Sequence, residues 1–378
     1  MKTIIRGYQS SFAQYEPVRI SFDYLCPESG SELPLIFMNQ IKMKMHLSNL
    51  IKLPGLLQTV IRSSKVQKRF INQTLYFDIE QSKRENDNSL NESDFRKITN
   101  YYGFAVPAIL GEGFCLLRGK SMSNRERNAL TYLGALTGLF DDFFDERELS
   151  DHYLKSLMDR PETAEVNNAN EKLFVTFAQK ALKNTSDIDG LKKASLKVYE
   201  AQVLSKKQKE ATISQEKIKD ITLQKGGYSI LFYRSVFQQA ADDTERQMLY
   251  YLGGIGQLEN DIFDIYKDYT NGIKTLATTT AHIEELRKVY RLLMEKTIDL
   301  VHRTNFSLKS KKKFLRFVAL IIARGFVCLD FLEKNEEKTN RTFSLKEYKK
   351  KDLICDMGTV KNNVKLINYY LKSDLRKK

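Results

Sequence analysis

The chain of 378 residues contains no tryptophan, four cysteines, four histidines and six prolines. No proline follows Pro161, so the rest of the chain lacks the residue that interrupts helices most strongly. The cysteines are widely separated and form no CxxC pair, which argues against a zinc site or a disulfide framework and indicates reduced thiols. The histidines lie outside the motifs described below, and we assign them no chemistry.

Long apolar runs are also absent. None approaches the roughly 20 residues that a membrane-spanning helix needs. The first residues lack the apolar core and the small-residue cleavage site of a signal peptide. We therefore expect a cytoplasmic protein, whose length and 42% apolar content suffice for a substantial core.

Basic charge is concentrated in the last fifth of the sequence. The formal net charge is +14, and residues 303–378 alone hold 20 Lys or Arg against 8 Asp or Glu, a net of +12. No zinc finger, RNP-type motif or helix-turn-helix accompanies this charge, so we expect no specific nucleic acid partner. Two interpretations remain: a solvated surface that aids solubility, and peripheral membrane contact through a basic segment at about residues 343–378.

Helical spacing dominates the rest of the sequence. From about residue 93 onward, apolar residues recur at helical intervals almost without interruption. A polar run over residues 81–94 separates this part from the leading segment, and strand-like alternation is confined to residues 18–24. We predict an all-α protein in which a partly helical extension (1–94) packs on a helical domain (95–378).

One pattern occurs twice, with the two copies 119 residues apart. The first copy spans residues 132–145 and the second spans residues 251–264. The matching positions are Tyr132, Leu133, Gly134, Leu139, Asp142, Phe144 and Asp145 with Tyr251, Leu252, Gly253, Leu258, Asp261, Phe263 and Asp264, and Asp141 corresponds to Asn260. Each copy places acidic or amide groups four residues apart on a segment that is otherwise apolar.

The first copy predicts a helix from about Arg125 to residue 147, with Ser123 as its N-cap. At 3.6 residues per turn, one face of this helix carries Gly134, Thr137, Asp141 and Asp145. The remaining faces are apolar, so the acidic stripe is expected to lie in the protein interior or in a wet cavity. Burying such carboxylates unpaired would cost several kcal/mol each, which implies a bound cation or a basic partner.

The second copy predicts a similar helix over about residues 243–269. Asn260, Asp264 and Asp268 are spaced four residues apart and form a line about 12 Å long. Because these ligands are oxygens, without His or Cys, they suit Mg²⁺ or alternatively Mn²⁺ rather than Zn²⁺. Two such patches facing one cavity would suit a diphosphate group bridged by several ions.

The segment DDFFD at residues 141–145 resembles the aspartate-rich DDxxD motif of class I isoprenoid synthases. The segment NDIFDIYKD at residues 260–268 resembles their second metal motif, as found in terpene synthases. Asp264 stands where terpene synthases usually have Ser or Thr, and Asp268 where they have Glu. With Asp264, the segment also resembles the aspartate-rich second motif of prenyl chain-elongating enzymes. The resemblance covers about residues 95–335.

This resemblance implies an all-α bundle around a central active-site cavity. It implies that Asp141 and Asp145, supported by Asp142, would hold two Mg²⁺ ions, and that Asn260, Asp264 and Asp268 would hold a third. It also implies a helix interrupted opposite the metal motifs, with a basic group that reaches the diphosphate. The adjacent glycines at residues 226–227 predict such an interruption. The candidates for the basic group are Lys225 first, then Arg234 and Lys267.

Five further residues are candidates for the substrate cavity: Gly134, Thr137, Phe144, Gly227 and Tyr228. The glycines either leave open space or let helices pack closely. The aromatic rings either stabilise a carbocation, by roughly 0.5–2 kcal/mol per ring, or pack in the core. The sequence leaves both alternatives open.

The sequence as a whole predicts a class I terpene synthase, which ionises an allylic prenyl diphosphate with Mg²⁺ and gives a cyclised or rearranged product. By the same resemblance we expect a homodimer. Two alternatives are enzymes: a prenyl diphosphate chain-elongating synthase and a condensing prenyltransferase of the squalene or phytoene type. A third is a non-catalytic relative that binds lipid or nucleic acid. Membrane-embedded prenyltransferases are excluded by the lack of apolar spans.

Overall fold

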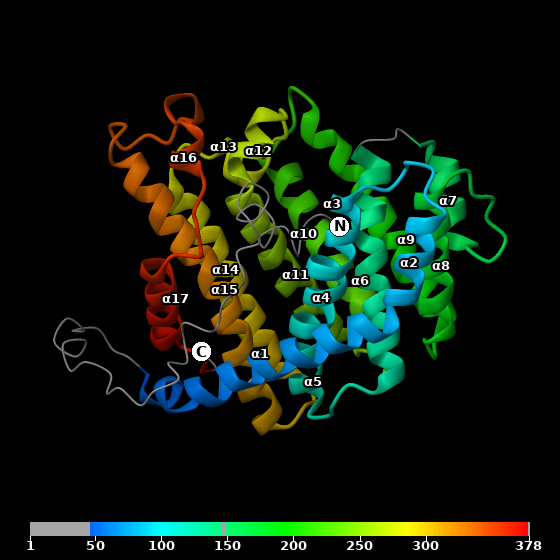
Figure 1. Cartoon of the computed structure of the whole chain (residues 1–378). Coiled ribbons are helices and arrows are strands. Elements are labelled where there is room, and N and C mark those ends of the chain that lie inside the picture. The colour runs from blue at the N-terminus through cyan, green and yellow to red at the C-terminus, as the bar shows by residue number, and fades with distance from the viewer. Residues whose placement is uncertain (1–45, 146–148, 377–378) are drawn as a thin grey trace.

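Helices form all of the regular secondary structure in residues 46–145 and 149–376, which the computed structural model describes (Figure 1). This confirms the all-α prediction for that part of the chain. None of the helices described is long and apolar enough to cross a membrane. The strand-like stretch at residues 18–24 lies outside the described residues, as do the side chains of Asp141, Asp142, Phe144, Asp145 and Asp151.

The elements follow one another along the chain with short connections. The α-helices are α1 (Leu47–Thr74), α2 (Tyr76–Arg84), α3 (Glu92–Arg96), α4 (Gly103–Ala105), α5 (Glu112–Arg118), α6 (Asn124–Asp145), α7 (Asp151–Asp159), α8 (Ala169–Lys183), α9 (Ile188–Ser205), α10 (Gln215–Arg234), α11 (Asp243–Phe263), α12 (Ile265–Thr270), α13 (Leu276–Thr279), α14 (Ile283–Arg303), α15 (Leu308–Glu336), α16 (Lys350–Leu353) and α17 (Val360–Lys372). Two π-helical turns, η4 (Lys97–Tyr102) and η5 (Val106–Gly111), and two 3-10 turns, η6 (Lys206–Lys209) and η7 (Leu345–Glu347), complete the series.

The leading helix α1 lies across one end of the bundle and is bonded to it by buried side chains (Figure 1). The Gln67 amide donates to the carbonyl oxygen of Gly103 and to Thr131 Oγ1, both at 2.9 Å. The Ser63 hydroxyl donates to the Ala108 carbonyl oxygen at 2.9 Å. The polar run that we predicted as a linker over residues 81–94 is shorter, because α2 continues to Arg84 and α3 starts at Glu92.

The helix α6 begins where the sequence predicted. The Ser123 hydroxyl accepts a hydrogen bond from the Glu126 amide at 3.2 Å, and the Glu126 carboxylate accepts one from the Ser123 amide at 2.8 Å. This reciprocal pair satisfies two of the amides that a helix start leaves without partners. The second acidic helix is α11, which begins at the predicted residue 243 and is capped by Asp242. A change of backbone conformation at Asp264 separates α11 from the short helix α12.

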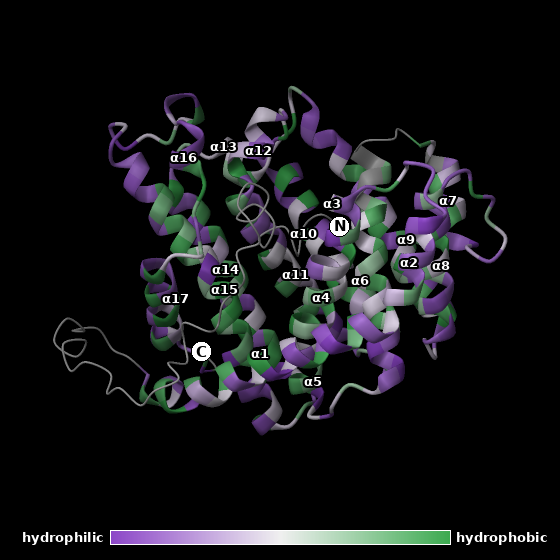
Figure 2. Cartoon of the chain, viewed as in Figure 1, coloured by the Kyte–Doolittle hydropathy of each residue, from purple (hydrophilic) through white to green (hydrophobic). Residues whose placement is uncertain are grey.

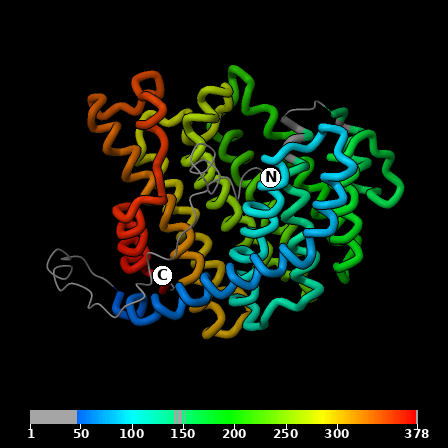
Figure 3. The backbone as a smooth tube through the Cα atoms, viewed as in Figure 1, coloured from blue at the N-terminus to red at the C-terminus, as the bar shows by residue number. Residues whose placement is uncertain are grey.

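The interior consists of three apolar clusters, and the bundle is apolar inside and polar outside (Figure 2). The largest cluster joins α6 to α8 and to the η4 segment. The second joins α11 to α14 and α15, and the third lies where α1 crosses α15 and α17. The tube view shows α6 and α11 running in the same direction, with their carboxyl ends at the same end of the bundle (Figure 3).

The predicted interruption at Gly226 and Gly227 is wrong. The helix α10 runs without a break from Gln215 to Arg234. The two glycines instead allow close packing against α11: a Cβ atom on Gly226 would lie 1.9 Å from the carbonyl oxygen of Gly253, and one on Gly227 would lie 2.3 Å from the Tyr250 ring. Glycine at these positions serves a tertiary contact between two continuous helices rather than a local turn.

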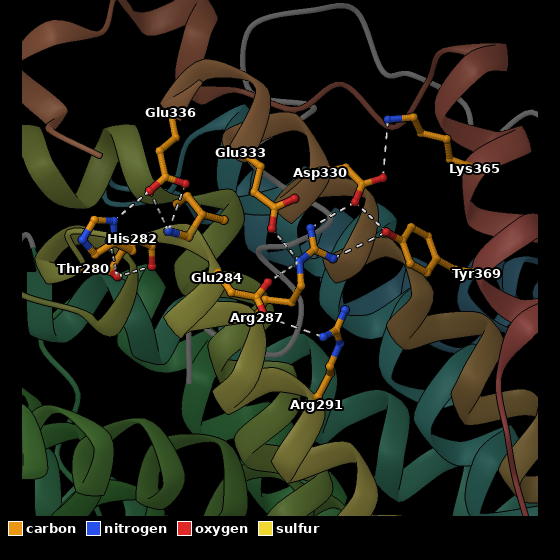
Figure 4. A network of polar contacts seen from close by, with 11 residues as sticks. Thr280, His282, Glu284, Arg287, Arg291, Asp330, Glu333, Glu336, Lys365 and Tyr369 are labelled. Atoms are coloured by element: carbon orange, nitrogen blue, oxygen red, sulfur yellow. Dashed lines mark hydrogen bonds and ion pairs between the residues drawn. The ribbon is translucent and has the colours of Figure 1, made fainter. Parts of the chain in front are cut away.

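The basic carboxyl-terminal segment folds back onto the bundle instead of extending from it. Arg287 of α14 bonds to Glu333 at 2.6 Å and to Asp330 at 3.0 Å, both on α15 (Figure 4). The Tyr369 hydroxyl of α17 donates to the same Asp330 carboxylate at 2.5 Å. This network fastens α17 to α14 and α15, and Tyr370 beside it is fully buried.

Candidate functional site

Both acidic motifs lie at the carboxyl ends of their helices, and these ends face the same side of the bundle (Figures 1 and 3). The first motif occupies the last turn of α6, over residues 141–145. Its backbone is helical, but the side chains of Asp141, Asp142, Phe144 and Asp145 are not described. The second motif spans the end of α11 and the first four residues of α12, and its side chains are described in full.

The face of α6 that leads to the first motif is packed against η4. A Cβ atom on Gly134 would lie 2.5 Å from the Tyr102 carbonyl oxygen, and one on Gly138 would lie 3.1 Å from Lys97 Cβ. Of the two alternatives for these glycines, the described geometry favours close helix packing. Gly138 lies one helical turn before the first motif, so Lys97 lies close to the helix turn that leads into that motif.

Lys97 is therefore a basic residue near the first motif that the sequence analysis missed. It forms an ion pair with Asp94 at 3.4 Å, and its side chain is 19% exposed. In the sequence, Lys97 is a single lysine 44 positions before Asp141, and a separation of that length does not predict that two residues lie close together. The packing of η4 on α6 reveals it.

Thr137, predicted to line the cavity, is fully buried and links α6 to α10. Its hydroxyl donates to the Leu133 carbonyl oxygen at 2.7 Å and lies 2.8 Å from the Tyr233 hydroxyl. Tyr228 lies on the α10 surface that packs on α11, with its ring 5.5 Å from the ring of Tyr250 in an edge-on arrangement. Gly227 lies against the same Tyr250 ring.

In the second motif, the structure buries Asn260 and Asp264. Asn260 is 6% exposed, and its amide oxygen Oδ1 is buried and accepts no hydrogen bond from any group in the described part of the chain. Asp264 is 4% exposed and lies at the junction of α11 and α12. A buried amide oxygen without a donor is destabilising unless something else satisfies it, and a hard cation would do so.

Asp261 is a second residue that the sequence analysis left out of the ligand set. It is 2% exposed, and its carboxylate accepts hydrogen bonds from Gln257 Nε2 at 2.6 Å and from Thr222 Oγ1 at 3.3 Å. Burial raises the pKa of this carboxyl to about 7, while the nearby Lys225 ammonium acts in the opposite direction. The sequence could have indicated Asp261 as a further ligand candidate, because residues 261, 264 and 268 share one helical face.

The acidic groups of the second motif also perturb one another. Burial is the main cause that raises the pKa of Asp268 well above its usual value, and the carboxylates of Asp261 and Asp264 add to this effect. Lys225 and Lys267 oppose the shift. Three carboxyl groups and two lysines thus lie within electrostatic range of one another at the second motif.

Lys225 is half-buried on α10 and lies within electrostatic range of Asp261 and Asp268. The contact between Gly226 and Gly253 sets this position, because it presses the Lys225 turn of α10 against α11. The structure therefore brings Lys225 to the second motif, of which Lys267 is itself a part.

Arg234, the remaining basic candidate, is engaged elsewhere. Its guanidinium binds the Glu245 carboxylate at 2.7 and 3.3 Å, and both side chains are 3% exposed. This buried pair joins the carboxyl end of α10 to the amino end of α11. It lies at the end of α11 remote from the second motif.

A narrow, mainly apolar cavity of about 30 Å³ lies between α6, α8, α9 and α10. Its walls include Leu133, Leu136 and Phe140 of α6 and Phe232 of α10. Phe140 directly precedes the first acidic motif, so the pocket lies beside α6 on the amino-terminal side of that motif. Lys192 and Ser195 of α9 are the polar residues of the lining.

Among the described side chains, no three His, Cys, Asp or Glu residues form a group that could hold a metal ion. The aspartate side chains of the first motif lie outside the described residues. The described donors at the second motif are oxygens, the type that a hard cation prefers: the buried Asn260 amide oxygen and the carboxyl groups of Asp264 and Asp268, which lie within electrostatic range of each other. The sequence matches no model of a known protein family, and no curated protein matches it.

Proposed function

We propose that this protein is a Mg²⁺-dependent enzyme that ionises an allylic prenyl diphosphate, with the helical bundle of a class I isoprenoid synthase. The observation that carries the proposal is the pairing of two matched acidic helix ends at one end of the bundle (Figures 1 and 3). The buried, unsatisfied amide oxygen of Asn260 at the second of these ends adds to it.

The residue roles follow from the chemistry of the groups. Asp141 and Asp145, with Asp142 beside them, would hold Mg²⁺ on one side of the site. Asn260, Asp264 and Asp268 would hold it on the other. When bound, Mg²⁺ neutralises the charge of the diphosphate and so makes it a better leaving group.

Two lysines of this chain would orient the diphosphate. Lys225 and Lys267 already lie near the second motif, and an ammonium group binds phosphate oxygens as a point charge. Arg234 is a weaker candidate, because removing it from Glu245 would leave a buried carboxylate without a partner.

The prenyl chain of the substrate would lie toward the apolar pocket beside α6. The rings of Phe140, Phe174 and Phe232 contribute to its walls. Apolar walls exclude water, and an allylic cation survives long enough to cyclise or couple only where water is kept away. Widening of this narrow pocket on substrate binding is part of the proposal.

The first experiment measures diphosphate release from allylic prenyl diphosphates of increasing chain length, with and without isopentenyl diphosphate, followed by product analysis. Release without the second substrate supports a terpene synthase. Release only with isopentenyl diphosphate indicates a chain-elongating synthase, and coupling of two allylic substrates indicates a condensing enzyme. If no substrate is turned over in Mg²⁺ or Mn²⁺, the enzymatic proposal fails.

A second experiment tests Lys225. Lys225→Met should weaken inhibition by inorganic diphosphate about tenfold or more, since a hydrogen bond to a charged group contributes roughly 1.5–3 kcal/mol. Lys219→Met on the same helix is the matched control, because its side chain is exposed. Equal inhibition constants for the two variants would remove Lys225 from the site.

A further inference from the structure

The outer face of α1 has an unusual composition. Its 28 residues contain five Lys or Arg and no Asp or Glu. The helix lies across the end of the bundle that is opposite to the carboxyl ends of α6 and α11 (Figure 1). Basic charge on this face is therefore not balanced by acidic residues of the same helix.

The two faces of α1 are clearly separated. Leu56 and Val60 face inward and pack in the apolar cluster that includes Phe317 of α15. The outward stripe advances in steps of four and three residues, as one face of a helix does. It consists of Leu47, Ile51, Gly55, Gln58, Arg62, Lys65 and Arg69, all of them exposed.

The outward stripe begins with the aliphatic residues Leu47 and Ile51 and ends with basic residues, and the ribbon of α1 is most hydrophilic toward its carboxyl end (Figure 2). Leu47 and Ile51 are 67% and 64% exposed, which is unusual for large aliphatic side chains. Arg62 keeps 72% of its side chain exposed although Glu112 lies 3.7 Å away.

The first turns of α15 continue this surface. Leu308 is 70% exposed, and Lys309, Lys312 and Lys313 are exposed beside it. Lys313 precedes Phe317, a residue in contact with the α1 cluster, by one helical turn. Aliphatic and basic side chains from two helices are thus combined at the same end of the bundle.

We propose that the outward face of α1, together with the first turns of α15, docks on the surface of an anionic phospholipid bilayer. Exposed lysine and arginine side chains are attracted to acidic headgroups, and exposed aliphatic side chains beside them insert at the boundary with the acyl chains. The aliphatic residues favour a bilayer over nucleic acid, which would be matched by basic and aromatic groups. This surface is distinct from the basic segment at about residues 343–378, for which the sequence predicted peripheral membrane contact.

The test uses the full chain and sedimentation with vesicles of phosphatidylcholine, alone or mixed with phosphatidylserine. The wild type should bind only the mixed vesicles. The triple variant Arg62→Glu/Lys65→Glu/Arg69→Glu should lose binding by at least about tenfold. A matched control, Lys207→Glu/Lys209→Glu/Lys219→Glu, makes the same change in net charge on exposed residues of η6 and α10 and should bind as the wild type does.

A second variant distinguishes the attraction of the basic side chains to the headgroups from the insertion of the aliphatic side chains. Leu47→Ser/Ile51→Ser keeps every basic residue, and it should weaken binding to the mixed vesicles, most clearly at high salt where charge attraction is screened. Equal losses in the triple variant and its control would overturn the proposal, as would equal binding to neutral vesicles. The proposal also fails if the wild type binds RNA but no vesicle, or if the triple variant instead abolishes a dimer seen by analytical ultracentrifugation.

Discussion

The contact between Gly226 and Gly253 determines how closely α10 approaches α11, and the variant Gly226→Ala tests it. A Cβ atom on Gly226 would lie 1.9 Å from the Gly253 carbonyl oxygen and 2.9 Å from Gln257 Cβ. Because the nearer atom belongs to the backbone, no side-chain rotation relieves the overlap. The two helices would have to separate by roughly 1 Å or more.

The expected size of the effect follows from two opposing contributions. Overpacking a well-packed interior typically costs about 1–3 kcal/mol, and a clash with backbone belongs at the upper end. Alanine is more favourable than glycine within a helix by about 1 kcal/mol, which offsets part of the loss. We expect Gly226→Ala to lower the free energy of unfolding by about 2 kcal/mol.

The matched control is Gly55→Ala in α1, where a Cβ atom would meet no atom within 4 Å. This variant should gain about 0.5–1 kcal/mol, since only the helix preference changes. Urea unfolding followed by circular dichroism at 222 nm measures both. A Gly226→Ala midpoint equal to or above that of Gly55→Ala would refute the close helix approach.

Two further predictions concern other buried groups. Burial raises the pKa of Tyr132 to about 12. The phenol of the unfolded chain therefore ionises near pH 10, while that of the folded protein stays neutral up to about pH 12. Between pH 10 and pH 12 the free energy of unfolding should fall by about 2–3 kcal/mol. Tyr132→Phe should remove that part of the fall in a series of urea unfolding curves, and an unchanged slope would contradict it. Glu245→Gln should destabilise the protein by about 3–5 kcal/mol, because it leaves the Arg234 charge buried without a counter-ion. The double variant Arg234→Met/Glu245→Met should lose less stability than Glu245→Gln does. An equal or larger loss in the double variant would show that the pair contributes through packing alone.

The sequence was sufficient to predict helices wherever local signals agree. Ser123 and Glu126 form a capping pair that is visible in the sequence, and the apolar spacing after it continues through α6. The same reasoning placed the start of α11 correctly. Such features depend on residues within a few positions of one another, so local propensity determines them.

The features that the sequence analysis missed depend on contacts between distant residues. Gly226 and Gly227 suggested a break, because a glycine pair has the same local appearance whether it turns the chain or admits a neighbouring helix. The partner Gly253 lies 27 residues later, and only the fold brings it into contact. The burial of Asp261 against Thr222 of α10 also depends on such a contact, although the helical face that Asp261 shares with Asp264 and Asp268 was visible in the sequence.

The central claim is that Asn260, in the second motif, helps to hold Mg²⁺ for the loss of diphosphate. The most direct measurement is the rate of diphosphate release from an allylic prenyl diphosphate by the wild type and by Asn260→Ala, each with Mg²⁺ or with EDTA. Asp189→Asn, at an exposed position in the first turn of α9, is the control. The account predicts release by the wild type and the control that requires Mg²⁺, and none by Asn260→Ala while its helical circular dichroism is unchanged. Release by Asn260→Ala at the wild-type rate, or release that persists in EDTA, would contradict it.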